Sequence, residues 1–157
     1  MRVGLGADAH ALVDGVPLVL GGVEVESERG LAGHSDGDVI SHALIDAVLG
    51  AAGLGDIGSL FPSDSDEWDG ASSLDLLARA YAQVREAGWE LVNADCVLVG
   101  EEPRIAPIRA EMRSHLAGAL GVEPELVNVR ATTTDGLGFT GRGDGLAALA
   151  VALLERD

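Results

Sequence analysis

The segment from Gly4 to His10 places a carboxylate and an imidazole two residues apart near the amino terminus. Alternate side chains of a β-strand leave the same face, so a strand that begins at Arg2 would present Asp8 and His10 side by side. Both groups are good ligands for zinc. For an isolated pair, a surface carboxylate beside a hydrogen-bonded histidine is the simpler interpretation. A metal site is favoured only if a third ligand lies nearby.

A predicted helix after position 38 supplies that third candidate. One stripe of this helix carries Asp38, His42 and Asp46 at i, i+4 and i+8, and an apolar stripe that should face the core contains Ile40, Ala43, Leu44, Ala47 and Val48. Together with the strand pair, His42 would complete a three-ligand site with an open fourth position, the pattern of a catalytic zinc centre. Asp46, one turn after His42, is the expected partner that fixes the tautomer of this imidazole.

The remaining histidines have different surroundings. His34 precedes the same helix, where free backbone N–H groups and the positive end of the helix dipole favour an anion. The alternative, compatible with the first, is that Ser35 and Asp36 simply cap the helix. His115 lies inside an ordinary amphipathic helix and is expected to have a structural role.

A second group of chemical residues lies in the glycine-rich segment 131–145. Its threonine hydroxyls, Arg142 and turn glycines suit contacts to phosphate oxygens beside a metal-binding Asp135. Glycine turns with threonines are common, so this composition is informative only in combination with the first site.

The elements that must position these groups alternate along the chain. We expect a hairpin that turns at Gly21 and Gly22, and later an irregular loop. Helices should follow at 72–87 and 103–120, strands at 91–99 and 127–133, and a last element at 145–154. The segment 145–154 is apolar all round and is predicted to be a buried closing helix, with part of the burial in an oligomer. The order predicts an α+β fold. It would be a two-layer α/β sandwich with one four-stranded mixed sheet, helices on one face, and a single domain over residues 1–157.

The composition argues against several classes of function, and the context of one apparent motif argues against dinucleotide binding. The 26 acidic and 10 basic residues give a net charge of -16, which argues against nucleic acid or an anionic membrane as partner. One cysteine, no apolar run near 20 residues and no signal peptide favour a cytoplasmic, soluble protein. Gly4 to Ala9 matches G-x-G-x-x-A, but a dinucleotide site needs a helix next, and Asp14 to Pro17 breaks the chain instead.

In combination, the motifs resemble those of the 2-C-methyl-D-erythritol 2,4-cyclodiphosphate synthase family. The matching segments follow one another along the chain: Gly-x-Gly-x-Asp-x-His at 4–10, His-Ser-Asp-Gly-Asp at 34–38, His42, Leu-Gly-Asp-Ile-Gly at 54–58, Phe-Pro at 61–62, and Thr-Thr-Thr-x-x-Leu-Gly-Phe-Thr-Gly-Arg-Gly at 132–143. The resemblance implies a homotrimeric enzyme of the non-mevalonate isoprenoid pathway, with active sites between subunits. Such an enzyme converts 4-diphosphocytidyl-2-C-methyl-D-erythritol 2-phosphate into the cyclic diphosphate and releases CMP.

The resemblance also implies roles for individual residues. Asp8, His10 and His42 would bind a divalent metal, usually zinc, with manganese or cobalt as alternatives. Asp135 would bind magnesium with the substrate diphosphate, and His34 and Thr133 would stabilise the transition state. The implied substrate contacts are Asp8, Ala9, His10, His34, Ser35, Asp56, Ile57, Gly58, Phe61, Pro62, Ser63, Asp64, Ser65, Gly100, Glu101, Glu102, Pro103, Arg104, Ile105, Ala106, Thr132, Thr133, Thr134, Asp135, Phe139 and Arg142.

Three positions depart from the family pattern. Asp135 replaces the usual glutamate and reaches about 1.5 Å less far, so we hypothesise that magnesium is held through a water or after a small loop shift. Gly136 replaces a common basic residue, and Ser63 replaces a common aspartate. Two other functions remain as alternatives at this point. One is a non-catalytic trimer that binds an isoprenoid diphosphate through Phe139 and Arg142, and the other is a zinc phosphohydrolase.

Overall fold

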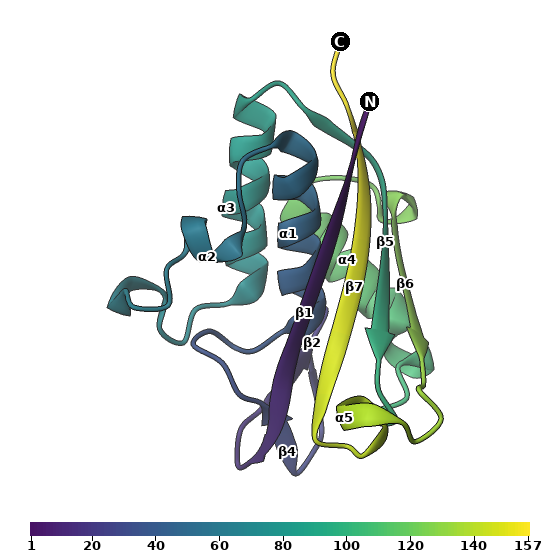
Figure 1. Cartoon of the computed structure of the whole chain (residues 1–157). Coiled ribbons are helices and arrows are strands. Elements are labelled where there is room, and N and C mark those ends of the chain that lie inside the picture. Colours follow the sequence, from purple (N-terminus) through teal and green to yellow (C-terminus); the bar gives the residue numbers. More distant parts are fainter.

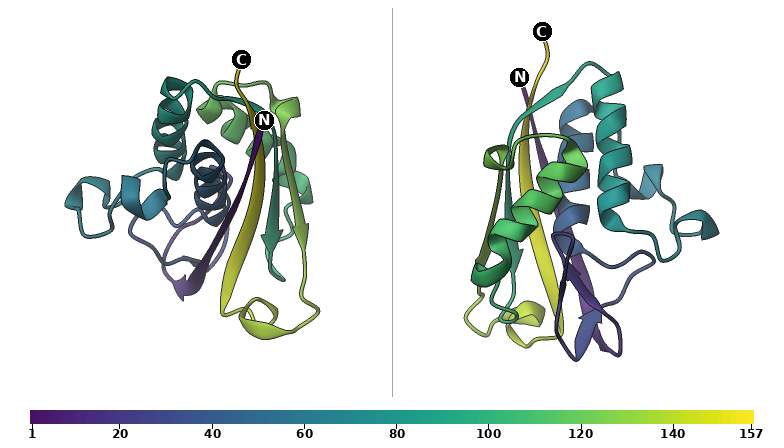
Figure 2. Two further views of the ribbon diagram at one scale, coloured as in Figure 1. Left: turned by 45° about the horizontal axis from the view of Figure 1, so that its top comes forward. Right: turned by 180° about the vertical axis from the view of Figure 1, so that it is seen from behind.

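A computed structural model describes residues 1–157, and it has an α+β architecture with the long helices gathered on one face of a twisted sheet (Figure 1, Figure 2). The strands are β1 (Arg2–Asp14), β2 (Leu18–Leu20), β3 (Val23–Val25), β4 (Arg29–Leu31), β5 (Glu90–Val99), β6 (Val127–Thr132) and β7 (Gly145–Glu155). The helices are α1 (Val39–Ala52), α2 (Ile57–Leu60), α3 (Ser73–Glu86), α4 (Arg109–Leu120) and α5 (Gly138–Gly141), with short 3-10 turns η1 (Asp66–Trp68), η2 (Ala106–Ile108) and η3 (Pro124–Leu126).

The main sheet has five strands in the order β4-β1-β7-β5-β6, so the predicted count of four is wrong. The sheet is mixed, as predicted, because β5 and β6 pair in parallel and the other neighbours are antiparallel. Two of the five strands were not expected, β7, which is described below, and β4, which is only three residues long and has no alternating pattern that sequence could reveal. The predicted hairpin is confirmed as β2 and β3, with positive φ at both Gly21 and Gly22, and it forms a separate small sheet.

The largest correction concerns the carboxyl-terminal segment, which is the central strand β7 and not a helix. One face of β7 is buried beneath the helices, through Leu146, Ala148, Ala150, Ala152 and Leu154. Its other face is also apolar, so the sequence shows neither the period of an amphipathic strand nor that of an amphipathic helix. Pairing with β1 on one side and β5 on the other overrides the helical preference of alanine and leucine.

Other boundaries differ less. The helix predicted over 103–120 begins only at Arg109, after the 3-10 turn that contains Pro107, because proline lacks the N–H that a continuous helix needs. The irregular segment 50–73 includes the end of α1 and two short helical turns, α2 and η1. Helix α3 begins at Ser73, and Ser72 occupies its N-cap position without a side-chain capping hydrogen bond.

Two glycines of β1 allow helix α1 to lie directly against the strand. A Cβ built on Gly4 would lie 2.0 Å from the carbonyl oxygen of Ala47, and one built on Gly6 would lie 1.8 Å from that of Ala43. These glycines therefore serve helix packing. The chain continues as a strand to Asp14, so no nucleotide-binding helix follows.

Replacing Gly6 with alanine is expected to lower the free energy of unfolding by about 3 kcal/mol or more, because backbone of α1 would have to move. Gly50→Ala is the matched control, since a Cβ at Gly50 meets nothing within 4 Å and alanine suits a helix better. Urea denaturation of both variants makes the comparison. Equal stability of the two variants would contradict the close packing of β1 and α1.

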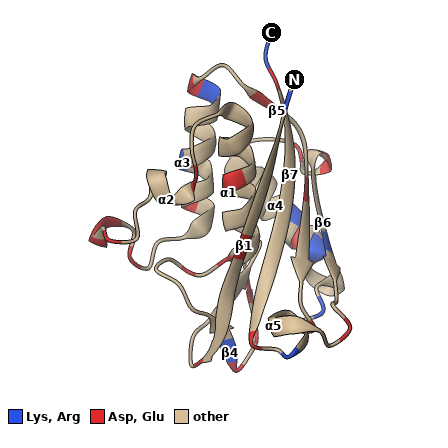
Figure 3. Cartoon of the chain, in the orientation of Figure 1, with Lys and Arg blue, Asp and Glu red and all other residues tan.

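The face of the sheet opposite the helices is apolar and uncovered in the single chain. Its largest exposed side chains are Val3 and Leu5 on β1, each 69% exposed, and Leu149 and Val151 on β7, 45% and 43% exposed. Leu5 lies directly opposite Val151 in the antiparallel register, so the four residues share one surface. Figure 3 shows that β7 carries no charge along nearly its whole length. None of the helices has the length and apolar character needed to cross a membrane.

Candidate metal centre and substrate pocket

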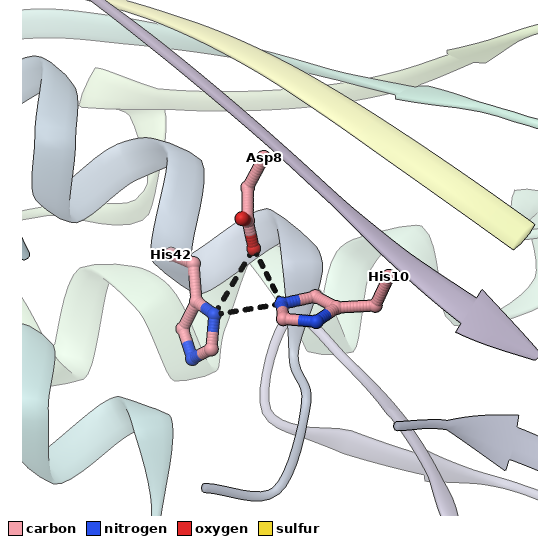
Figure 4. Close-up of side chains that lie close together, drawn as sticks. All are labelled: Asp8, His10 and His42. Carbon is pink, nitrogen blue, oxygen red and sulfur yellow. Dashed lines mark hydrogen bonds and ion pairs between the residues drawn. The ribbon is translucent and has the colours of Figure 1, made fainter. Parts of the chain in front are cut away.

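Asp8 and His10 on β1 and His42 on α1 converge on one point, as the sequence predicted (Figure 4). Oδ2 of Asp8 lies 2.7 Å from Nε2 of His10 and 3.0 Å from Nδ1 of His42, and the two imidazole nitrogens are 3.1 Å apart. The close contact of α1 with the glycines of β1 brings the third ligand within reach of the other two.

This donor set fits a divalent metal. Two imidazole nitrogens and one carboxylate oxygen are common zinc ligands, and ligand atoms around a tetrahedral zinc lie roughly 3.3 Å apart. The three side chains need to separate by only a few tenths of an ångström to accept the ion. With three protein ligands, the fourth coordination position would remain open to the pocket described below.

The same contacts shift the pKa values of two ligands. Burial alone would raise the pKa of the Asp8 carboxyl, but the adjacent imidazoles, first through the hydrogen bond with His10 and then through the proximity of His42, lower this pKa to about 2. The hydrogen bond to Asp8 raises the pKa of His10 above its ordinary 6.5, although burial opposes that shift. In the absence of metal, the site therefore favours an ionised Asp8 beside a protonated His10.

Protons should compete with metal at this site, because a metal ligand must be a neutral imidazole. Below the raised pKa of His10, zinc affinity should fall about tenfold for each pH unit, through the one proton that the metal must displace. Competition with a chromophoric chelator at a series of pH values measures this slope. An affinity that stays constant as the pH falls below 6.5 would contradict the placement of His10 as a ligand.

In the metal-free protein, the free energy of unfolding should also depend on pH, but the His10 contribution falls as the pH rises. Because the folded-state pKa of His10 is raised, its pairing with Asp8 stabilises the fold fully below the unfolded value of 6.5 and is lost as pH rises through the folded value. Asp8 contributes stability above its unfolded value of 3.8, which is lost as the pH falls towards about 2.

The prediction that Asp46 is the hydrogen-bond partner of His42 is wrong. Oδ1 of Asp46 accepts a hydrogen bond from the backbone N–H of Ile57 at 2.7 Å, at the start of α2, and makes none with His42. The other ring nitrogen of His42, Nε2, instead lies 2.8 Å from Oγ of Ser73 and 3.0 Å from Oγ of Ser35.

The cap of α1 also differs from the prediction. Asp38 is the N-cap, is fully buried, and accepts hydrogen bonds from the backbone N–H groups of Gly21, Gly22 and Ser41 and from the Ser41 hydroxyl. Asp36 accepts from the Asp38 N–H at 3.1 Å and lies just before the cap. The position predicted for Ser35 and Asp36 is therefore taken by Asp38, which also ties the β2–β3 hairpin to the helix.

A pocket of about 580 Å³ opens beside the three ligands. Besides Asp8, His10 and His42, it is lined by eight residues that the family resemblance implied for the substrate: His34, Ser35, Ile57, Gly58, Phe61, Pro62, Ser63 and Asp64. Trp68 and Leu76 also line it and were missed. Trp68 packs edge-to-face on Phe61 with ring centroids 4.9 Å apart. The signal in the sequence was a second aromatic residue in the loop that carries Phe61, in a chain with only 3% aromatic residues.

Asp56 and Ser65 are implied substrate residues that lie at the edge of this region. Asp56 caps α2, and its fully exposed carboxyl has a lowered pKa because the backbone N–H of Ser59 donates to it. Ser65 caps the short turn η1.

Among the implied substrate contacts, the family resemblance assigns residues 100–106 and 132–135 to the cytidine diphosphate, and these lie apart from the pocket. The segments 100–106 and 132–135 follow the parallel strands β5 and β6, where Gly100 donates its backbone N–H to the Thr132 carbonyl at 3.1 Å. The Thr133 hydroxyl donates to Glu101 Oε1 at 2.5 Å and accepts from the Asp135 N–H at 2.9 Å. None of these residues lines the pocket, because β7 separates β1 from β5.

Phe139, Arg142 and His115 are the remaining residues for which the sequence suggested a role. Phe139 is 43% exposed and lines a smaller hollow of about 270 Å³ with Ala9 and His10. The Arg142 guanidinium pairs with Asp144 at 3.0 Å on the surface. His115 lies 2.9 Å from the Gly22 carbonyl oxygen through Nδ1, in keeping with a structural role.

The model of the YgbB family matches residues 1–155. The chain belongs to the YgbB family. This YgbB-family chain is 55% identical over 154 residues to the 2-C-methyl-D-erythritol 2,4-cyclodiphosphate synthase of Moorella thermoacetica, covering 98% of this chain and 94% of the relative. It is 58% identical to the bifunctional enzyme IspD/IspF of Desulforudis audaxviator, again over 98% of the chain, but spans only 39% of that longer protein.

Solved structures agree with this family membership. A structure of 2C-methyl-D-erythritol-2,4-cyclodiphosphate synthase in a bound form with CDP has a TM-score of 0.89 and 37% identity, over 98% of this chain and 100% of that one. The bifunctional IspDF of Campylobacter jejuni has a TM-score of 0.96 and 43% identity, over 99% of this chain and 42% of that one. The resemblance that the motifs indicated is thus confirmed across the YgbB-family chain.

Proposed function

We propose that the chain is a metal-dependent phosphorus–oxygen lyase of the non-mevalonate isoprenoid pathway. It converts 4-diphosphocytidyl-2-C-methyl-D-erythritol 2-phosphate into 2-C-methyl-D-erythritol 2,4-cyclodiphosphate and releases CMP. The main support for this proposal is the Asp8–His10–His42 group, which lines a pocket together with Ile57, Gly58 and neighbouring residues. The names of the relatives that the chain covers almost completely support the same reaction. A non-catalytic binder would have no need of the three-ligand group.

The reaction needs no covalent bond to the protein. An oxygen of the substrate's 2-phosphate forms a bond to the β-phosphorus, and the bond from that phosphorus to the oxygen of CMP breaks. Zinc at Asp8, His10 and His42, with manganese or cobalt as alternatives, would supply positive charge to the phosphate, as would magnesium at Asp135. His34 and Thr133 would donate hydrogen bonds to the developing charge.

The pocket residues contribute proximity. The N–H groups and side chains around α2 and Phe61 would fold the erythritol chain so that its two phosphates meet, which converts an unfavourable approach of two anions into a near-attack geometry. A chain of net charge -16 repels such a substrate at long range. Bound cations and local N–H groups must therefore provide the positive potential.

The active unit is proposed to be a homotrimer with sites between subunits. Two observations support it. The metal pocket and the segments implied for the cytidine diphosphate are separated by β7 within one chain, so a complete site would need residues from a neighbour. The uncovered face of β1 and β7 carries exposed apolar side chains that an interface would bury. We also propose that residues 1–157 act as one domain in the cytoplasm, a reducing compartment that suits a single buried cysteine.

Metal removal tests the proposed function directly. Dialysis against a strong chelator should abolish CMP release, and zinc with magnesium should restore it, whereas either metal alone should restore little. Liquid chromatography of CMP measures the rate. Full CMP release by the chelator-treated protein would contradict a metal-dependent lyase.

A further inference from the structure

A buried hydrogen-bond chain leads away from the outer nitrogen of His42. Ser73, the first residue of α3, is fully buried, and its hydroxyl contacts Nε2 of His42 at 2.8 Å. The same hydroxyl makes a short hydrogen bond to Oδ1 of Asp36. The Ser73 backbone N–H donates to Oδ2 of Asp36 at 3.0 Å, so both carboxylate oxygens are held by one residue.

The positions of the protons along this chain follow from the donor and acceptor inventory. An ionised carboxylate only accepts hydrogen bonds, so the single Ser73 hydroxyl proton points to Asp36. The Ser73 oxygen can then only accept from His42, which places the imidazole proton on Nε2. Nδ1, the nitrogen that faces Asp8 and His10, is left with its lone pair.

We propose that Ser73 and Asp36 are positioning residues that hold His42 in the tautomer able to bind metal through Nδ1. This inference rests on the proposed metal site and assigns to Ser73 and Asp36 the role that the sequence suggested for Asp46. Ordered partners of this kind are known to fix the orientation and basicity of metal-binding histidines.

The hydrogen bonds from His42 through Ser73 to Asp36 must overcome an interaction that favours the other tautomer of His42. Oδ2 of Asp8 lies 3.0 Å from Nδ1 of His42 and, without metal, attracts a proton to the wrong nitrogen. Ser35 offers a second acceptor, with Oγ 3.0 Å from Nε2, but its hydroxyl is not directed by a carboxylate. Ser73 alone combines burial, a fixed proton and contact with Nε2.

This hydrogen-bond relay, from His42 through Ser73 to Asp36, also connects parts of the pocket. Asp36 belongs to the same loop as His34 and Ser35, and its backbone N–H donates to the Ala71 carbonyl at 3.1 Å. The Gly70 N–H donates to the His34 carbonyl at 2.8 Å. The loop that carries the implied transition-state histidine is thereby fixed to the start of α3 and, through Ser73, to the metal ligand.

Two readouts test the proposal. The first is long-range ¹⁵N–¹H correlation NMR of the histidine rings in metal-free protein, which should show the proton on Nε2 of His42 in the wild type and a shift towards Nδ1 in Ser73→Ala. The second is zinc affinity by chelator competition, which should fall about 10- to 100-fold in Ser73→Ala. Ser73→Thr, which keeps the hydroxyl, should recover most of both signals.

Ser72→Ala is the matched control, because Ser72 is the adjacent serine, is exposed, and makes no side-chain capping bond. It should leave the tautomer and the zinc affinity unchanged. Asp36→Asn provides a second variant with the same expected direction, should Ser73→Ala fail to fold.

The outcomes separate the relay from the metal site. A wild-type His42 that carries its proton on Nδ1, or a Ser73→Ala protein with unchanged tautomer and zinc affinity, would overturn the relay. A wild type that binds no zinc would refute the proposed metal site, while the tautomer measurement would still decide whether Ser73 directs the ring.

Discussion

Replacing His10 with alanine is expected to reduce kcat/KM for CMP release by on the order of 10³-fold and to eliminate bound zinc. His10 would supply one of only three protein ligands, and Asp8 and His42 would leave a weak two-ligand site. A loss of that size corresponds to about 4 kcal/mol of transition-state stabilisation, which is typical of a metal that neutralises phosphate charge. Elemental analysis and CMP chromatography on the same sample measure both effects.

His115→Ala is the control for this change. His115 lies on α4, outside the pocket, and its contact with the Gly22 carbonyl is structural. The control should keep its zinc and its activity, although the lost hydrogen bond costs about 1 kcal/mol of stability. Full zinc content and activity in His10→Ala would contradict the metal centre itself.

The double variant Leu149→Asp, Val151→Asp is expected to be monomeric and to lose at least about 100-fold in activity. Both residues lie on the uncovered face of the central strand, so two charges there would be desolvated in the proposed trimer but solvated in a monomer. Activity should fall with assembly because a single chain keeps the metal pocket apart from the cytidine segments. Sedimentation velocity and CMP release measure the two effects.

The control places a similar charge on the helical side. Gln83→Asp lies at an exposed position of α3, and it should leave the assembly and the activity unchanged. Circular dichroism should show the same fold in both proteins, because the substituted side chains of the double variant face outward. An active monomer would refute the proposal that the sites lie between subunits.

The candidate metal ligands could be predicted because each comes from an element with a clear local period. Asp8 and His10 occupy alternate positions of β1, and His42 lies on a helix whose apolar stripe identifies its core face. The family motifs added residues implied for substrate binding, and eight of these line the same pocket. Local pattern and motif together therefore located one half of the site.

Features that depend on distant parts of the chain could not be predicted. Segment 145–154 is apolar on both faces, so only its pairing between β1 and β5 makes it a strand. Ser73 lies 31 residues from His42, and no spacing rule connects them, whereas Asp46 was the obvious neighbour on the same helix. The separation of the two groups of residues implied for the substrate likewise follows from strand order, which the sequence does not display.

Phosphorus NMR of the reaction with purified protein, zinc and magnesium identifies the product and so distinguishes cyclisation from hydrolysis. The substrate is 4-diphosphocytidyl-2-C-methyl-D-erythritol 2-phosphate, and we expect one equivalent of CMP together with the resonances of a cyclic diphosphate. A linear phosphate product would indicate attack by water and a zinc phosphohydrolase. That product, or an unchanged substrate spectrum with both metals bound, would contradict the proposed lyase.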